Sequence, residues 1–311
     1  MMGEKSNGLV FKRRVEFCEH PPFPHNMMVE LTNACNHNCV FCGYSGMRRP
    51  RKIADKDFTK KIIREAYENG TREIGFYLIG EPFLNPDLAE YVGFCKKTGF
   101  EYIYITTNGG EAGPNQLKEV IHAGLDSIKF SVNGATVESY KKVHGKNDYK
   151  KVKDNIVWLR EYLDKNNLPL KTFISFVKCN LNSGDEITIH DEFDDYVDKV
   201  YIFECSNQGG AMLSLLKNGV VDSLLPGAKA PCRMVFNRLH ITAEGYLDAC
   251  CADVNGNLVV ADLHKMSLID AWNSEIMEDL RKQHLEGFTS NIMCNSCINN
   301  VEQKIVPLIK S

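Results

Sequence analysis

No hydrophobic run in this 311-residue sequence reaches the length of about 18 residues that crosses a bilayer, so a membrane protein is not expected. Residues 1–12 also lack the long apolar core and small-residue cleavage site of a signal peptide. Basic residues are not in excess, because the formal net charge is −3, which argues against nucleic-acid binding. The 12 cysteines therefore predict a cytoplasmic protein whose thiols bind metal rather than form disulfides.

The chain does not need a metal merely to fold. Its composition is 43% hydrophobic, and a chain of this length buries roughly three quarters of its unfolded surface. Cysteines are therefore free to serve chemistry. Residues 1–25 are polar and then proline-rich, which predicts an arm across the outside of the fold.

Three of the cysteines, Cys35, Cys39 and Cys42, lie within eight residues, and no fourth cysteine accompanies them. Thiolates are soft ligands that select zinc, copper(I) or iron–sulfur clusters. If the centre is a [4Fe–4S] cube, three thiolates leave one iron open, as a catalytic centre requires. The alternative is a zinc knuckle that is completed by His37 or by a distant ligand.

Hydrophobic periodicity predicts an alternation of strands and helices through the first two thirds of the chain. The predicted strands span residues 27–31, 74–79, 102–106, 127–132, 170–177 and 200–204. Helical patterns lie between them at residues 55–68, 86–97, 114–123 and 149–163. This order indicates a parallel sheet of right-handed βαβ units. Because ligands bind at the carboxyl ends of such strands, the loops that follow the strands should share one site.

The alternation stops after about residue 226, and the cysteine density rises again. Cys232 is followed by Gly245 and then by Cys250, and Cys294 and Cys297 close the set. Four thiolates at these spacings can hold zinc or a second [4Fe–4S] cluster. Gly245 is expected to begin a hairpin turn that returns Cys250 towards Cys232. Because neighbouring side chains on a strand face opposite sides, Cys251 is assigned to packing near the centre.

The first cysteine loop, with the aromatic Phe41 before its third cysteine, resembles that of the radical SAM enzymes. The resemblance implies a partial (β/α)6 barrel over residues 26–225. It also implies that the open iron binds S-adenosylmethionine (SAM), whose reductive cleavage yields a 5′-deoxyadenosyl radical. An electron donor of the flavodoxin or ferredoxin type is expected.

The loops after the later strands resemble the SAM-binding segments of that family. Gly80 and Glu81 match its Gly-Glu-Pro motif, whose glutamate holds the methionine ammonium. Asn108 lies in a segment expected near SAM, and Ser131 and Asn133 match positions for its carboxylate and ribose. The family more often has aspartate at the position of Asn133. The pair Gly209-Gly210 resembles one that lets the backbone approach the adenosine. Each of these segments can also be read as an ordinary turn.

Residues 226–311 resemble the auxiliary cluster modules of the SPASM/twitch radical SAM proteins. The full SPASM pattern continues with two further cysteines, whereas none follows Cys297, so the match is to the single-cluster twitch form. The resemblance thus implies two [4Fe–4S] clusters, one that binds SAM and one auxiliary.

A closed auxiliary cluster suits electron transfer, so the first hypothesis is an oxidoreductase that acts on a secondary alcohol of a sugar, cyclitol or nucleotide-sugar. The second is a peptide-modifying maturase that forms thioethers, epimers or formylglycine. A third is an electron carrier that never cleaves SAM. The catalytic base is unassigned, and the candidates are Tyr77, Glu204, His240 and Asp253. The remaining cysteines, Cys18, Cys95, Cys179 and Cys205, are expected to be small buried hydrophobic side chains.

Overall fold

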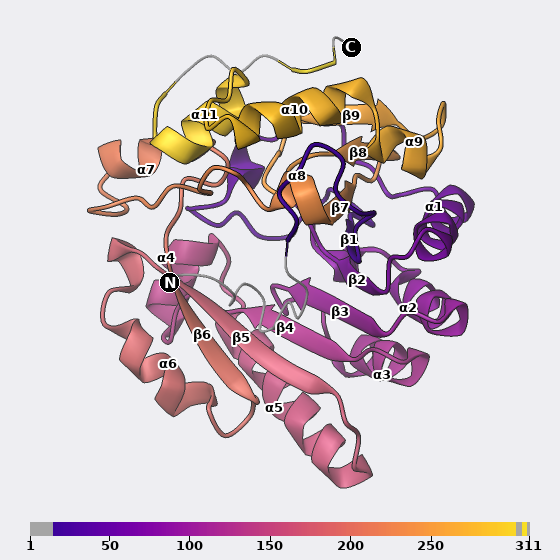
Figure 1. The fold of residues 1–311 in the computed structure, drawn as a ribbon. Coiled ribbons are helices and arrows are strands. Elements are labelled where there is room, and N and C mark those ends of the chain that lie inside the picture. Colours follow the sequence, from indigo (N-terminus) through magenta and orange to yellow (C-terminus); the bar gives the residue numbers. More distant parts are fainter. Residues whose placement is uncertain (1–14, 303–306, 310–311) are drawn as a thin grey trace.

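The computed structural model describes residues 15–302 and 307–309, and within these residues nine strands form one sheet (Figure 1). The order of the strands is β6-β5-β4-β3-β2-β1-β7-β8-β9. The strands are β1 (Asn26–Val29), β2 (Glu73–Phe76), β3 (Tyr102–Thr107), β4 (Ser127–Ser131), β5 (Lys171–Lys178), β6 (Lys199–Glu204), β7 (Arg238–Ile241), β8 (Tyr246–Asp248) and β9 (Val259–Asp262).

In this order, every strand from β6 across the sheet through β1 to β7 is parallel to its neighbours. The last two pairs, β7 with β8 and β8 with β9, are antiparallel. The six predicted strands are present as β1 to β6, so the predicted α/β class with a parallel sheet is confirmed. The sheet does not stop where the alternation stops, because β7 pairs with β1 in parallel. This strand was not recognised because Arg238 and His240 alternate with its apolar residues, so it lacks the apolar run of the other strands. The carboxy-terminal segment therefore extends the sheet of the core.

Helices α1, α2 and α3 lie along one side of the sheet (Figure 1). Local signals set their ends: the Asp55 side chain accepts a hydrogen bond from the backbone of Phe58 at the start of α1, and Gly99 and Gly124 end α2 and α3. The helices are α1 (Lys56–Glu68), α2 (Leu88–Thr98), α3 (Pro114–Ala123), α4 (Val137–His144), α5 (Tyr149–Asn166), α6 (Asp185–Phe193), α7 (Ser214–Lys217), α8 (Met234–Asn237), α9 (Leu268–Trp272), α10 (Glu275–Leu285) and α11 (Ile292–Asn299). Among the described residues, no helix is both long enough and apolar enough to cross a bilayer.

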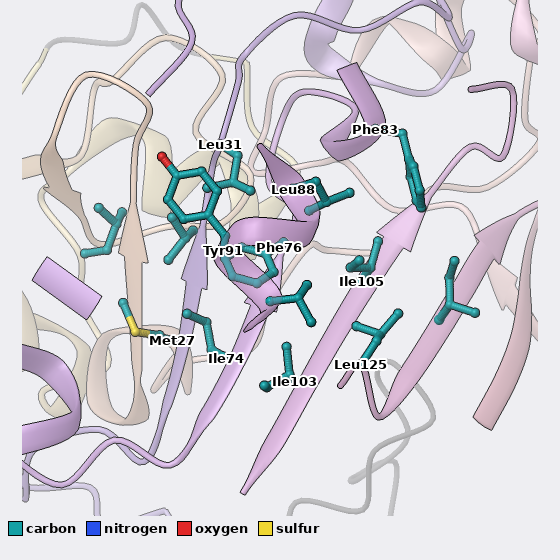
Figure 2. Close-up of a cluster of buried hydrophobic side chains, with 14 of the residues drawn as sticks. Met27, Leu31, Ile74, Phe76, Phe83, Leu88, Tyr91, Ile103, Ile105 and Leu125 are labelled. Atoms are coloured by element: carbon teal, nitrogen blue, oxygen red, sulfur yellow. The ribbon is translucent and has the colours of Figure 1, made fainter. Parts of the chain in front are cut away.

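The hydrophobic core lies between the sheet and these helices (Figure 2). Met27, Ile74, Phe76 and Ile103 are fully buried in it. Because side chains alternate along a strand, the residues between them face the other side of the sheet. That second face carries polar groups, and the Tyr104 hydroxyl donates a hydrogen bond of 3.1 Å to Asn26 there.

One buried arginine joins the core to the carboxy-terminal segment. Arg49 follows the cysteine loop, and its guanidinium donates two hydrogen bonds of 2.9 Å to Glu30 at the end of β1. The same group reaches Glu244 in the β7–β8 turn at 2.7 Å and the carbonyl of Val254 at 2.9 Å. Four bonds from one side chain therefore fix the cysteine loop relative to the hairpin.

The predicted arm can be followed only in part, because residues 1–14 lie outside the described residues. Its later part contacts both ends of the chain. The carbonyl of Pro24 accepts a hydrogen bond from Thr71 at 2.7 Å, and the carbonyl of Pro21 accepts one from Trp272 at 3.4 Å.

Candidate metal centres

The loop after β1 brings Cys35, Cys39 and Cys42 together. The Tyr44 hydroxyl accepts a hydrogen bond from the Cys35 amide at 2.9 Å and donates one to its carbonyl at 3.2 Å. The Cys42 amide donates to the carbonyl of Cys39 at 3.0 Å. The thiols are close enough that the charge of Cys42 raises the pKa values of both Cys35 and Cys39.

These thiols are held where a bare thiolate is unfavourable. Burial raises the pKa of Cys35 to about 11, and the charges of Glu81 and Cys42 contribute to the increase. Burial likewise raises the pKa values of Cys39 and Cys42. A cationic metal centre would reverse this, because a coordinating thiol is deprotonated outright. Three converging, buried soft donors therefore fit the open-site iron–sulfur cluster that the sequence predicts.

The loop after β2 crosses the chain that leads into the cysteine loop. A Cβ atom on Gly80 would lie 2.0 Å from the carbonyl oxygen of Thr32, so only glycine fits there. The Glu81 amide donates to the carbonyl of Ala34 at 2.8 Å. The Gly-Glu-Pro segment is therefore built against the cysteine loop.

The Glu81 carboxylate is buried, and it accepts hydrogen bonds from the loop after β3. Its partners are the Thr107 hydroxyl and the Asn108 amide, both at 2.7 Å, and the Phe83 amide at 3.1 Å. Burial raises the pKa of Glu81 to about 7 in spite of these bonds. A cation beside this carboxylate would favour its charged form.

The Asn108 side chain connects the loop after β3 to the cysteine loop. Its amide nitrogen donates to the Asn36 side chain at 2.7 Å and lies 3.8 Å from the Cys35 sulfur. Asn108 thus lies beside the cysteine loop, and its expected place near SAM stays a prediction.

The structure gives Ser131 and Asn133 different surroundings. Ser131 is half-buried and accepts a hydrogen bond from Ser175 at 3.4 Å. Asn133 is buried, and its side-chain oxygen accepts from the Val177 amide at 2.8 Å. Because the Asn133 side chain already connects the ends of β4 and β5, its predicted contact with the SAM ribose stays a prediction. Phe41 is buried in a second hydrophobic cluster with Val143.

Two histidines lie beside the cysteine loop: His37, which the sequence offered only as a ligand of the alternative zinc knuckle, and His144, which the sequence did not suggest. His37, within the loop, and His144, at the end of α4, have Nδ1 atoms 3.1 Å apart. The His37 Nε2 atom lies 3.0 Å from the Asp148 carboxylate, and the Cys39 sulfur lies 3.5 Å from the His144 Nδ1 atom. The place of His37 between two cysteines marked it as a candidate ligand in the sequence, whereas no sequence signal marked His144.

A second group of thiols lines one small apolar cavity of about 30 Å³. The four predicted cysteines all face it: Cys232, Cys250, Cys294 and Cys297. They come from the segment before α8, the turn after β8, and α11. Residues up to 65 positions apart (297 − 232) therefore line one cavity, as the spacing predicted.

Backbone amides point at these thiols. Burial raises the pKa of the Cys297 thiol to about 11, and the nearby backbone amides of Ala228, Gly227 and Gly209 oppose this increase. Burial raises the pKa of Cys232 to about 12. An apolar cavity lined by four thiols, two of which belong to buried residues, fits a closed, four-thiolate metal centre.

The pair Gly209-Gly210 lies against the carboxy-terminal segment, and its expected approach to the adenosine stays a prediction. A Cβ atom on Gly209 would be 2.8 Å from the Met293 side chain, and one on Gly210 would be 2.6 Å from Ser296. The pair therefore packs against α11 in the carboxy-terminal segment, because both glycines have positive φ angles that allow the close approach.

The argument from strand alternation, which favours Cys250 over Cys251 as the ligand, is wrong. Strand β8 ends at Asp248, so alternation along a strand does not apply to the two cysteines. Their thiols are hydrogen-bonded to each other, which raises the pKa of Cys250 and lowers that of Cys251. Cys250 lines the cavity, and the choice between them stays a prediction. The predicted hairpin at Gly245 is confirmed, with a φ angle of +90°.

The remaining cysteines mostly follow the prediction. Cys95, Cys179 and Cys205 are buried, whereas Cys18 is exposed because it lies on the arm. The candidate bases also differ in their exposure. Glu204 is exposed, and its carboxylate lies 3.2 Å from the Lys178 ammonium. The other candidates, Tyr77, His240 and Asp253, lie on the inner strands or beside the cavity; His240 is fully buried and Asp253 is 4% exposed.

Two family descriptions match the chain: the Radical SAM superfamily over residues 29–182, and an iron–sulfur cluster-binding domain named SPASM over residues 232–298. The chain is 25% identical over 299 residues to a protein of Saccharolobus solfataricus named "Probable GTP 3′,8-cyclase", a match that covers 84% of this chain and 91% of that protein.

Two solved structures share the fold. BtrN in complex with AdoMet and 2-DOIA has a TM-score of 0.57 and 18% identity, covering 86% of this chain and 89% of BtrN. Streptococcus suis SuiB bound to its precursor peptide SuiA has a TM-score of 0.68 and 16% identity, covering 89% of this chain and 70% of SuiB.

Proposed function

Because the chain belongs to the radical SAM superfamily and carries a SPASM iron–sulfur domain, we propose that it is an oxidoreductase for a secondary alcohol. The family implies SAM and [4Fe–4S] clusters as its cofactors. Cys35, Cys39 and Cys42 hold the cluster that binds SAM. When bound, SAM and this cluster supply a 5′-deoxyadenosyl radical, and the auxiliary cluster supplies an electron acceptor.

The loops around the first cysteine loop orient SAM. Glu81 presents a buried carboxylate whose pKa is raised to about 7, and the methionine ammonium of SAM would stabilise its charged form. Asn108 and the half-buried Ser131 lie at the ends of neighbouring parallel strands, β3 and β4, so both are available on the same rim.

The observation that carries the proposal is the cavity with four cysteines. Four thiolates fill the ligand positions of a cluster, so the auxiliary centre leaves no iron open for substrate. Oxidation of a secondary alcohol to a ketone removes one hydrogen atom from carbon, one proton from oxygen and one electron. A closed cluster is suited to accept the electron.

The substrate class is a sugar, cyclitol or nucleotide-sugar. The shared fold and similar length of BtrN, crystallised with AdoMet and 2-DOIA, support a small-molecule substrate. The fold of SuiB, whose structure holds a precursor peptide, supports the alternative of a peptide-modifying maturase. The chain's match to the GTP 3′,8-cyclase makes GTP a necessary competitor in any assay. We expect a cytoplasmic protein reduced by a flavodoxin or ferredoxin.

The test uses the anaerobically reconstituted protein with dithionite, SAM and a panel of myo-inositol, glucosamine, UDP-glucose, GTP and a cysteine-containing peptide. The proposal expects a product 2 Da lighter than a polyol, formed with one equivalent of 5′-deoxyadenosine. With a substrate deuterated at the carbinol carbon, the 5′-deoxyadenosine should gain one deuterium. Turnover of GTP or of the peptide alone would refute the dehydrogenase assignment.

Substitutions test the assignment of the cluster. Replacing Cys35, Cys39 and Cys42 by alanine should abolish 5′-deoxyadenosine formation. The matched control is Cys95→Ala, because Cys95 is a buried cysteine in the hydrophobic core. Formation of 5′-deoxyadenosine by the triple variant would show that this loop does not hold the reactive cluster.

A further inference from the structure

The hydrogen bonds around His144 fix which of its nitrogens carries the proton. The backbone amide of Asn133 donates to the His144 Nε2 atom at 3.0 Å, so Nε2 is the acceptor. In a neutral imidazole the other nitrogen then carries the hydrogen. The Nδ1–H group of His144 therefore points into the site.

Two acceptors lie in front of that Nδ1–H group. The His37 Nδ1 atom is 3.1 Å away, and the Cys39 sulfur is 3.5 Å away. The His37 Nε2 atom lies 3.0 Å from the Asp148 carboxylate, which can only accept. His37 thus has its hydrogen on Nε2 and a free lone pair on Nδ1. The His144 Nδ1–H group is consequently shared between His37 and the Cys39 thiolate.

The backbone holds this ring against the cysteine loop. The Asn38 amide donates to the His144 carbonyl at 3.0 Å, and the Val40 amide donates to the Val143 carbonyl at 2.9 Å. These bonds bracket Cys39 on both sides. His144 is fully buried, and its ring stacks on Tyr140 with the centroids 4.0 Å apart. The ring is therefore aimed at Cys39 by contacts that do not depend on a cluster.

We propose that His144 is a positioning residue that donates a hydrogen bond from Nδ1–H to the Cys39 thiolate and so raises the reduction potential of the cluster that Cys39 holds. The inference rests on the proposed ligation of that cluster by Cys39. Hydrogen bonds to cluster sulfurs set the potential because they stabilise the more negative, reduced form. His37 and Asp148 limit the effect, because His37 competes for the same hydrogen.

A zinc site made of His37, Cys39 and His144 is the competing reading, since one donor atom of each lies within 4.8 Å of the others. Two nitrogens on one tetrahedral zinc are separated by about 3.4 Å, given bonds of about 2.0–2.1 Å. The observed separation of 3.1 Å is that of a hydrogen bond. Cys39 also belongs to the three-cysteine loop, so a zinc ion would take a ligand from the cluster.

The test measures the midpoint potential of the EPR signal that responds to SAM in the full-length protein with both clusters. His144→Phe keeps the ring and removes the donor, and the reduction equilibrium constant should fall about ten-fold, or about 59 mV for one electron. His144→Asn, which restores a donor near the Nδ1 position, should return the potential towards the wild-type value. Lys142→Ala is the control, because Lys142 is an exposed residue on the same helix, α4, and its change should leave the potential unchanged.

Three outcomes would overturn the inference. The first is a reduction potential that does not change in His144→Phe although the cluster is intact. The second is a wild-type protein that binds one zinc ion per chain, with this zinc lost in both His144→Phe and His37→Phe. The third concerns the wild-type protein and does not depend on any variant folding. With ¹⁵N-labelled histidine, pulsed EPR of the reduced cluster should show a histidine nitrogen coupling, and its absence would exclude the bond. A wild-type protein without any SAM-responsive cluster would instead refute the proposed function.

Discussion

Arg49 should be one of the most stabilising side chains outside the hydrophobic core. Its side chain is 11% exposed, and that of its partner Glu30 is 1% exposed. Arg49→Met would leave the Glu30 carboxylate buried without its counter-charge and would free Glu244 from the β7–β8 turn. Removal of one partner of a buried pair costs about 3–5 kcal/mol. Because Arg49 retains some contact with solvent, the lower end of that range, about 3 kcal/mol, is expected.

The measurement is an anaerobic thermal melt of the reconstituted protein. A loss of about 3 kcal/mol corresponds to a decrease in Tm of about 6 °C for a large domain. Arg48→Met is the matched control, because Arg48 is the exposed neighbouring arginine. The double variant Arg49→Met with Glu30→Gln should recover part of the loss by removing the unpaired charge. If Arg49→Met melts within about 2 °C of the Arg48→Met control, the buried network does not join the hairpin to the core as described.

Three further predictions concern the two centres. In the wild-type protein, the affinity for SAM measured by titration calorimetry should rise from pH 6 to 8, because the pKa of Glu81 is about 7 and its carboxylate forms over this range. Glu81→Gln should weaken SAM binding and remove this pH dependence. The raised pKa also makes the stability of the unliganded protein depend on pH. Glu81 contributes fully to folding below its unfolded pKa of about 4.5, and this contribution is lost as the pH rises through its folded pKa of about 7. Cys250→Ala should remove about half of the bound iron and Cys251→Ala should not, as colorimetric iron analysis would show; the reverse result would assign the ligand to Cys251. Gly80→Ala should impair assembly of the SAM-binding cluster, since its Cβ atom would lie 2.0 Å from the Thr32 carbonyl, and full iron loading would contradict this.

The sequence was sufficient for the sheet as far as β6, because each of these strands carries its own hydrophobic pattern and is separated from the next by a helical pattern or turn. It was not sufficient for β7, in which Arg238 and His240 interrupt the apolar pattern and which is fixed by pairing with β1 and β8. Helices α4 and α6 were also missed, since eight or nine residues give little periodicity. Short elements such as these are fixed by tertiary contacts rather than by local preference.

The candidate site shows the same division. Short spacings identified the cysteines of both centres, because ligands of one metal cluster must lie close together. The orientation of single side chains was less accessible. The order Cys250-Cys251 suggested a strand, but the chain has already left β8 and the two thiols face each other. His144 lies 105 residues from Cys39 and could be placed beside it only by the fold.

The most direct test of the account is the amount of iron and sulfide per chain in the anaerobically reconstituted protein, with Mössbauer and EPR spectra recorded with and without SAM. Two four-iron clusters predict about eight irons, with the spectrum of one cluster changed by SAM and that of the other unchanged. About four irons and one zinc would contradict the account, because the cavity of Cys232, Cys250, Cys294 and Cys297 would then be a structural site without an electron acceptor.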